Sequence, residues 1–320
     1  MGYTRYLALI GIVLFLYILC SVGPFEILGN FSKIDFSIFA VVLALVVPIL
    51  LLKGLKQQIL VSAVGKRLSL VENTRVWLIG FFFGSVTPAK AGDFLRAHYL
   101  NKCCGLSLGA GLAATAMERI LDLLFMFLAA VLGLLFFSLE FSIGIEVISV
   151  LVGFLFLFVI GLAVLSRKRW VSFLLRPIFK FLLPEKFKER FKSGFHDFYN
   201  SIFPLVKKRQ AMLTLAVLTV GSWLLIIFQY YLIAVSLQLP VSFELILSVM
   251  PAILLIEALP ISFAGVGTRD ATTIFLLGFA GIAAASAVSF SLAILAMNML
   301  TTLIGLAALT SFKGREALPK

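Results

Sequence analysis

Long apolar stretches recur along the whole chain, and each is long enough to cross a lipid bilayer. A membrane-spanning helix needs about 17–25 predominantly apolar residues, and six segments reach that length: 6–22, 36–55, 106–137, 143–165, 211–237 and 283–310. Hydrophobic residues make up 62% of the chain and charged residues 13%, whereas a soluble domain is about half apolar and about a quarter charged. The sequence therefore predicts an all-α polytopic membrane protein, with residues 1–320 as one membrane domain. The composition excludes a soluble globular enzyme, a disordered chain and a disulfide-stapled secreted module.

The positive charges fall on one side of the predicted spans. Lysines and arginines are concentrated in 53–75, in 166–209 and in the C-terminal tail, whereas the opposite loops 23–35, 138–142 and 238–244 hold a single cation between them. Cytoplasmic loops are enriched in lysine and arginine, so both termini are predicted to be cytoplasmic, in a plasma or inner cell membrane. The net charge of +12 follows from the same rule, and no nucleic-acid partner is expected.

Two further apolar segments, 76–100 and 245–280, are interrupted by proline, glycine and charged residues. With both termini inside, the first must enter from the cytoplasm and return to it, and the second must enter from outside and return there. Each is predicted to form a re-entrant pair of half-helices. The order span, re-entrant pair, span then occurs once in each half, 1–165 and 210–320, with opposite orientations. This is an inverted-topology repeat, the plan of many secondary transporters.

The loop 166–209 is predicted to form a basic amphipathic helix. Phenylalanines recur at helical spacing, as at Phe187, Phe191 and Phe195, with lysines and arginines between them. Such a helix binds the anionic lipids of the inner leaflet. A helix that binds a calmodulin-like partner is the alternative.

Helix-breaking and charged residues coincide in both interrupted segments. The first segment contains Pro88, Lys90, Gly92, Asp93 and Arg96. The second contains Pro260, Gly265, Gly267, Arg269 and Asp270. In each, we expect proline to end one half-helix, glycine to permit the reversal, and aspartate to cap the amides of the next half-helix. Capping alone would explain the two aspartates but not the cations beside them.

A third group of charges, Glu118, Arg119 and Asp122, lies inside the predicted span 106–137. Glu118 and Asp122 are four residues apart and share a helix face, and Arg119 can reach Asp122. Each unpaired charge at the bilayer centre costs about 2.5–3.5 kcal/mol. We therefore expect the three groups to meet, either as a structural ion-pair network or, as we favour, around a polar cavity for a charged substrate.

The expected cavity offers charges of both signs. Its basic residues, together with the N-termini of the half-helices, can hold a phosphate or phosphodiester. Its carboxylates can instead pair with a cationic headgroup or bind protons for coupled transport. The sequence does not choose between these uses.

Motifs for catalysis or metal binding do not occur. The three cysteines, Cys20, Cys103 and Cys104, and the two histidines, His98 and His196, lack ligand spacing. Nucleotide-binding, serine-nucleophile and metalloprotease motifs are also missing. We expect no enzyme activity, no cofactor and no metal.

Together the three groups resemble the transmembrane domain of the lysylphosphatidylglycerol synthase/flippase family, the membrane half of the multiple peptide resistance factor. The matching residues run Pro88-x-Lys90-x-Gly92-Asp93-x-x-Arg96, then Glu118-Arg119-x-x-Asp122, then Pro260-x-Ser262-x-x-Gly265-x-Gly267-x-Arg269-Asp270. The two aspartates at the breaks stand where the family more often has glutamate. The resemblance covers about residues 5–310 and does not include the aminoacyl-transferase domain of the full-length synthases. It implies a stand-alone member that moves lipids between leaflets and does not synthesise them.

The leading hypothesis is thus a flippase for a phospholipid or a polyprenyl-phosphate-type lipid, whose charged headgroup occupies the cavity. One alternative is a proton-coupled small-solute transporter that uses Glu118 and Asp122. Another is a non-transporting membrane partner of a glycosyltransferase or lipid synthase. Membrane lipids are the expected partners, and a homo-oligomer is compatible with the sequence.

Overall fold

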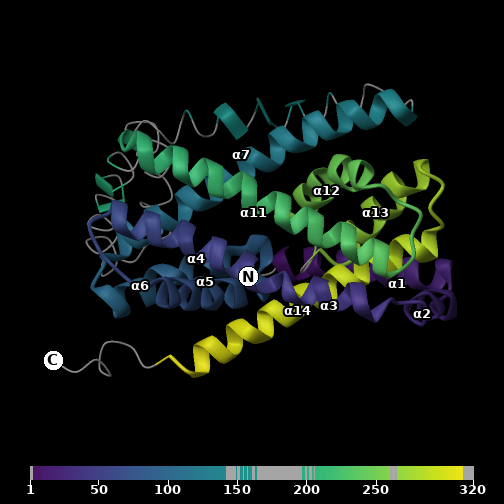
Figure 1. The fold of residues 1–320 in the computed structure, drawn as a ribbon, viewed down its shortest axis with the longest axis horizontal. Coiled ribbons are helices and arrows are strands. Elements are labelled where there is room, and N and C mark those ends of the chain that lie inside the picture. Colours follow the sequence, from purple (N-terminus) through teal and green to yellow (C-terminus); the bar gives the residue numbers. More distant parts are fainter. Residues whose placement is uncertain are drawn as a thin grey trace.

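The structure is a computed structural model, and it describes residues 3–141, 149, 152–153, 155–156, 158–160, 163, 197–198, 200–201, 204, 206–259, 262 and 265–312. The described residues form helices joined by short turns, and they contain no strand (Figure 1). The helices are α1 (Tyr3–Val22), α2 (Pro24–Phe31), α3 (Phe36–Ala44), α4 (Val46–Ala63), α5 (Leu70–Ser85), the 3-10 helix η1 (Pro88–Leu95), α6 (Arg96–Cys104), α7 (Leu108–Phe141), α11 (Arg209–Ser236), α12 (Phe243–Ala258), α13 (Thr268–Phe279) and α14 (Ala284–Thr310). The all-α class predicted from the sequence is confirmed.

Four helical stretches in the described part of the chain are long and apolar enough to cross a membrane: Phe36–Ala63, α7, α11 and α14. A fifth candidate is the pair formed by Val13–Val22 and α2, which is bent by 81° at Gly23. The chain is therefore a multi-pass membrane protein. The predicted span 143–165 and the amphipathic helix predicted in 166–209 lie largely outside the described residues, so the count of six spans stays a prediction.

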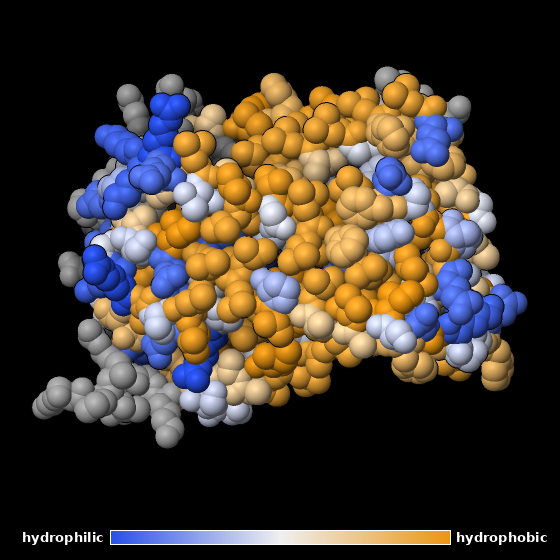
Figure 2. Space-filling view, viewed as in Figure 1, coloured by the Kyte–Doolittle hydropathy of each residue, from blue (hydrophilic) through white to orange (hydrophobic). Residues whose placement is uncertain are grey.

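The surface has the polarity that a bilayer requires. In Figure 2, apolar residues cover the middle of the visible face and hydrophilic residues gather toward its two ends. Large apolar side chains such as Leu132 on α7, Val217 on α11 and Leu303 on α14 are more than half exposed. Soluble monomers rarely expose contiguous apolar surface on this scale, and lipid chains would cover it in a membrane.

The two interrupted segments lie in opposite halves of the molecule. Figure 1 shows α5 and α6 in one half and α12 and α13 in the other. We call the interruptions of these two segments the first break, around Pro88–Arg96, and the second break, around Pro260–Asp270. At the second break, Gly265 and Gly267 have φ angles of 77° and 85°, which favour glycine because a Cβ is strained there. Asp270 accepts a hydrogen bond of 2.8 Å from the backbone N–H of Gly267 and so caps α13.

The first break is built differently from what the sequence suggested. Pro88 does not end the preceding helix: α5 already stops at Ser85, and Pro88 is the first residue of η1, where its missing N–H costs no hydrogen bond. Asp93 lies inside η1 rather than at the start of α6, and its side chain forms an ion pair rather than a cap. Pro260 lies outside the described residues.

Pairs of helices from the two halves hold the core together. α7 packs against α12, α14 packs against α5, and α4 packs against α11. The first two pairs meet backbone to backbone at a glycine. A Cβ on Gly133 of α7 would overlap the Ser248 carbonyl of α12, and a Cβ on Gly305 of α14 would overlap the Leu78 carbonyl of α5. These contacts bring both broken segments against the long helices.

Candidate functional site

The salt bridges at the centre of the described structure join six basic and five acidic side chains, which we call the charge network. Its members are Lys53, Lys56, Lys90, Asp93, Arg96, Glu118, Arg119, Asp122, Glu257, Arg269 and Asp270. They come from α4, the first break, α7, α12 and the second break. Two of them keep substantial exposure: the side chain of Lys90 is 40% exposed and that of Arg119 is 28% exposed. The others are buried.

Arg96 and Glu118 form the tightest link between the first break and α7. Arg96 Nη1 lies 2.6 Å from Glu118 Oε2 and 3.3 Å from Gln57 Oε1, and its Nε donates to the backbone oxygen of Asp93 at 3.2 Å. The second oxygen of Glu118 accepts a 3.0 Å hydrogen bond from Trp77 Nε1. Both charges therefore have polar partners, which a buried ion pair requires to offset its desolvation.

Asp122 is held by two lysines of α4. Lys56 Nζ lies 2.5 Å from Asp122 Oδ1 and Lys53 Nζ lies 3.5 Å from Oδ2, while Trp223 Nε1 of α11 donates to Oδ1 at 3.0 Å. The positive-inside rule groups Lys53 and Lys56 with the cytoplasmic cations of 53–75, but neither is an exposed loop residue. The helix continues to Ala63, eight residues beyond the predicted end of the span, and both lysines are buried.

Arg119 forms its ion pair with Asp93 of η1. The sequence predicted Asp122 as its partner because the two lie three apart on one helix, but the lysines of α4 occupy that carboxylate. Gly84 of α5 makes room for Asp93, since a Cβ there would overlap the Asp93 carboxylate. The first break is thus fixed to α7 by two ion pairs and to α5 by close packing.

The second break contains a chain of contacts centred on Arg269. Its Nη1 lies 3.6 Å from Glu257 Oε2, its Nη2 lies 3.9 Å from Asp270 Oδ1, and its Nε donates to Ser291 Oγ at 2.8 Å. Ser291 in turn donates to Asp270 Oδ1 at 2.5 Å. Lys90 of the first break lies 3.4 Å from Glu257 Oε1. The Lys90–Glu257 pair therefore joins the two breaks.

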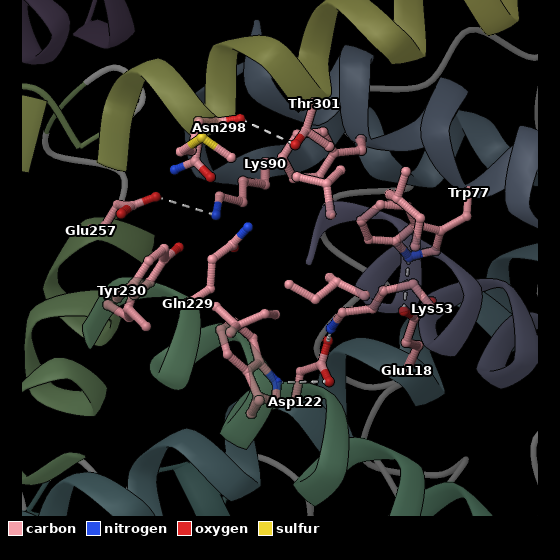
Figure 3. Close-up of a pocket in the computed structure, with 18 of the residues that line it drawn as sticks. Lys53, Trp77, Lys90, Glu118, Asp122, Gln229, Tyr230, Glu257, Asn298 and Thr301 are labelled. Carbon is pink, nitrogen blue, oxygen red and sulfur yellow. Dashed lines mark hydrogen bonds and ion pairs between the residues drawn. The ribbon is translucent and has the colours of Figure 1, made fainter. Parts of the chain in front are cut away.

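A cavity of about 110 Å³, the central cavity, lies in the middle of the charge network (Figure 3). Six members of the network line it: Lys53, Lys90, Glu118, Arg119, Asp122 and Glu257. Neutral polar residues, including Gln229, Tyr230, Asn298 and Thr301, complete the wall. One water needs only ~10–15 Å³ on this measure, so the cavity can hold a small charged group.

The remaining members of the network lie behind the wall. Lys56, Asp93, Arg96, Arg269 and Asp270 are buried and do not line the central cavity. Of the predicted binding residues, the structure thus brings Lys90, Glu118, Arg119 and Asp122 to the cavity. Of the glycines predicted at the helix breaks, Gly92 lies in η1 with Lys90, where a Cβ would overlap the Phe83 carbonyl. Gly265 and Gly267 lie just before Arg269 in the second break.

A second cavity of about 210 Å³, the side cavity, lies on the other side of the Lys90–Glu257 pair. The two cavities share Phe81, Lys90, Glu257 and Asn298 as wall residues. Most of the remaining wall of the side cavity is apolar, and Val86 and Met299 at this wall are 46% and 56% exposed on the surface. The side cavity therefore lies between the charged centre and exposed apolar residues.

Comparison with known proteins now identifies the chain. The sequence profile described as the lysylphosphatidylglycerol synthase transmembrane region matches residues 6–305. The protein belongs to this family. The resemblance drawn from the three motifs is confirmed.

Two curated relatives carry the name UPF0104 membrane protein, both from Methanothermobacter thermautotrophicus. The first is 24% identical to this chain over 290 residues, covering 86% of this chain and 85% of the relative. The second is 29% identical over 119 residues, covering 37% of this chain and 35% of the relative. No solved structure matches the chain significantly. Membership of the lysylphosphatidylglycerol synthase transmembrane family fits a lipid-related role in the membrane.

Several residues of this family member were missed as parts of the site. Lys53 and Lys56 follow an apolar run and were therefore attributed to the positive-inside rule. Lys56 and Gln57 follow Lys53 by three and four residues, so a helix that continues past residue 55 places all three on one side of α4. This spacing was the available signal. Glu257 belongs to none of the three groups of charged residues singled out in the sequence. Trp77 and Trp223 could not be recognised as site residues in the sequence. The role of an indole N–H in an apolar run becomes clear only when its hydrogen-bond acceptor is known.

Proposed function

We propose that this protein moves a lipid with a charged headgroup between the two leaflets of a cell membrane, without breaking a covalent bond. The observation that supports this best is the central cavity, which places a charge network inside a protein with an apolar outer surface. Charges at this depth are costly and typically mark substrate pathways. Family membership supports a lipid as the substrate.

An inverted repeat would allow the cavity to open to either side in turn. The packing is consistent with one. α7 packs against α12 as α14 packs against α5, and α6 packs against α7 as α13 packs against α14. In each half an aspartate of the break contacts the long helix that follows: Asp93 contacts Arg119, and Asp270 contacts Ser291. The close crossings at Gly133 and Gly305 are a further matching pair.

The side cavity favours a lipid over a small solute. A soluble substrate needs a pathway closed to the bilayer, whereas a lipid must keep its chains in hydrocarbon while its headgroup is in the polar cavity. The side cavity meets that need, because its mostly apolar wall adjoins the central cavity and its residues Val86 and Met299 are exposed at the surface. We propose that a lipid chain occupies the side cavity while the headgroup occupies the central one.

The test is leaflet-resolved transport in proteoliposomes that contain phospholipids with a fluorescent headgroup label. A reductant added outside destroys only outer-leaflet fluorescence, so about half of the signal is protected without transport. We expect the purified protein to abolish this protection. Thr301→Trp should block transport by filling the central cavity. Leu303→Trp on the same helix, which faces outward, should not.

Two results would contradict the proposal. If well-folded protein moves none of the anionic, zwitterionic or polyprenyl-phosphate lipids tested, it is not a flippase for these classes. If Thr301→Trp transports as well as Leu303→Trp, the central cavity is not the pathway. Uptake of a soluble ion or metabolite into sealed proteoliposomes, which the solute cannot enter unaided, would instead favour the solute carrier.

A further inference from the structure

The charge network holds one more cation than it holds carboxylates. Every acidic residue that lines either cavity, among those the structure describes, already belongs to the network. An uncompensated charge in an apolar protein interior is strongly unfavourable. A ligand with one negative charge would balance the network, whereas a cationic ligand would increase the imbalance.

Four of the six cations are not free to reach a ligand in the central cavity, because each is either in close contact with a carboxylate or completely buried outside the cavity wall. Arg96 and Lys56 lie 2.6 Å and 2.5 Å from their carboxylates, Arg119 is in contact with Asp93, and the Arg269 side chain is 0% exposed. The sequence suggested Arg269 and the N-terminus of α13 as an anion-binding site. Neither lines the central cavity.

Lys53 and Lys90 line the central cavity, unlike Lys56, Arg96 and Arg269, and neither contacts its carboxylate as closely as Arg119 does. Their ammonium groups lie 3.5 Å and 3.4 Å from the nearest carboxylate oxygens, distances longer than a normal hydrogen bond. Each of those carboxylates has a second cation, since Asp122 keeps Lys56 and Glu257 keeps Arg269. Either lysine can therefore turn to a ligand without leaving a buried carboxylate alone.

The two lysines line the same cavity from different elements. Figure 3 shows the Lys53 and Lys90 side chains on the wall of the central cavity, with the open space between them. Lys53 comes from α4, whereas Lys90 comes from the first break and has a φ angle of 54°. A lysine in this left-handed region is uncommon, and such positions cluster at ligand sites.

We propose that the central cavity binds a phosphate group between Lys53 and Lys90. The ammonium groups would donate charge-assisted hydrogen bonds to the phosphate oxygens, and Tyr230 and Asn298 on the same wall offer neutral donors. The identification of the phosphate as part of a lipid rests on the proposed function. The phosphodiester of a phospholipid carries the single negative charge that balances the network.

Ligand binding to the full-length protein in detergent tests this inference. The probes are phosphatidylglycerol, inorganic phosphate and the phosphate-free cationic lipid dioleoyl-trimethylammonium-propane, each measured by native mass spectrometry and by thermal stabilisation. We expect phosphatidylglycerol to bind and the cationic lipid to bind much less. Lys53→Met and Lys90→Met should each weaken phosphatidylglycerol about tenfold or more, as expected for a lost charged hydrogen bond.

Matched controls separate binding from folding. Lys90→Met leaves Glu257 paired with Arg269, so this variant should fold even if Lys53→Met does not. Lys90→Arg keeps the charge and should keep most of the affinity. Lys33→Met removes one exposed lysine far from the network in sequence and should bind phosphatidylglycerol like the unmodified protein.

The outcomes distinguish this inference from the proposed function. Unchanged phosphatidylglycerol binding in folded Lys90→Met and Lys53→Met would overturn the phosphate site, as would equal binding of the cationic lipid. Lipid transport that does not depend on either lysine would keep the flippase and reject the site. Lysine-dependent binding of inorganic phosphate alone would support the site but reject a lipid as its ligand.

Discussion

Arg96 on α6 and Glu118 on α7 lie 2.6 Å apart in an ion pair whose side chains are almost completely buried. Gln57 and Trp77 provide further hydrogen bonds to the two partners. The pair therefore connects the first break to three neighbouring helices, α4, α5 and α7. Glu118 is part of the cavity wall and Arg96 lies behind it, so the pair is a structural element of the site.

Removing either charge of this pair should destabilise the protein. Arg96→Met or Glu118→Gln leaves the other partner buried and uncompensated, which costs about 3–5 kcal/mol. We expect both single variants to show lower thermal stability and lower yield, measured by size-exclusion chromatography of heated, detergent-solubilised protein. The double variant Arg96→Met/Glu118→Gln should lose less than the sum of the single losses. Strictly additive losses would show that the two residues are not coupled.

A single methyl group at Gly84 should disturb the first break. The added Cβ would overlap the Asp93 carboxylate, so the ion pair with Arg119 must move. Gly84→Ala should therefore lower the melting temperature. Gly221→Ala on α11 is the matched control, because its Cβ meets no atom within 4 Å and alanine favours a helix by about 1 kcal/mol. If both variants melt alike, the close packing at Gly84 is not important.

Arg269 should prove essential for folding. It is completely buried and contacts Glu257, Asp270 and Ser291, so Arg269→Ala removes a buried cation from beside two buried carboxylates. We expect a loss of yield of the folded protein. Arg269→Lys should recover only part of it, because one ammonium group cannot reproduce the planar guanidinium fork. Normal yield with selective loss of ligand binding would instead make Arg269 a substrate contact.

Cysteine labelling should reveal the orientation in the membrane. Ser32 and Ser311 are both exposed and lie at opposite ends of the spans. With cytoplasmic termini, Ser32→Cys should react with a membrane-impermeant thiol reagent added outside intact cells, and Ser311→Cys should react only after permeabilisation. The reverse pattern would invert the topology deduced from the charge asymmetry.

Native Cys103 should interfere little with this assay near neutral pH. Burial, reinforced by Glu72 and Cys104, raises the pKa of the Cys103 thiol to about 11. Only the thiolate reacts, so labelling of Cys103 in permeabilised membranes should be very slow at pH 7 and should increase as the pH approaches 11. Rapid labelling of Cys103 at pH 7 would contradict the burial of this thiol. Mass spectrometry of the labelled peptide provides the measurement.

The sequence predicted the membrane class and the breaks because the bilayer imposes those features locally. A span must be apolar over its whole length, and proline, glycine and charge at one place stand out against that background. The stretch around Pro88 and Asp93 and the stretch around Gly265 and Asp270 could therefore be located without coordinates. The beginning of η1 at Pro88 could not, because the end of α5 is decided by packing.

Ion-pair partners were less predictable than charged positions. Arg119 and Asp122 are neighbours on one helix, yet Arg119 pairs with Asp93 and Asp122 pairs with Lys56, 66 residues away. Local spacing gives the partners that a residue can reach in an isolated helix. In the folded protein, partners from other helices compete for the same carboxylate. Lys53 and Lys56 illustrate the point, because the positive-inside rule treats such lysines as exposed.

The contacts at Gly133 and Gly305 limit how this molecule can change shape. At both places a helix backbone touches the carbonyl of the helix it crosses, with no side chain between them to shift to another rotamer. Sliding of these helices along each other would require the backbones to separate, whereas tilting about the contact points would not. The two crossings could therefore serve as pivots, each between a helix of the first half and a helix of the second. A rocking motion about them would widen the space around the charge network on one side of the membrane while narrowing it on the other.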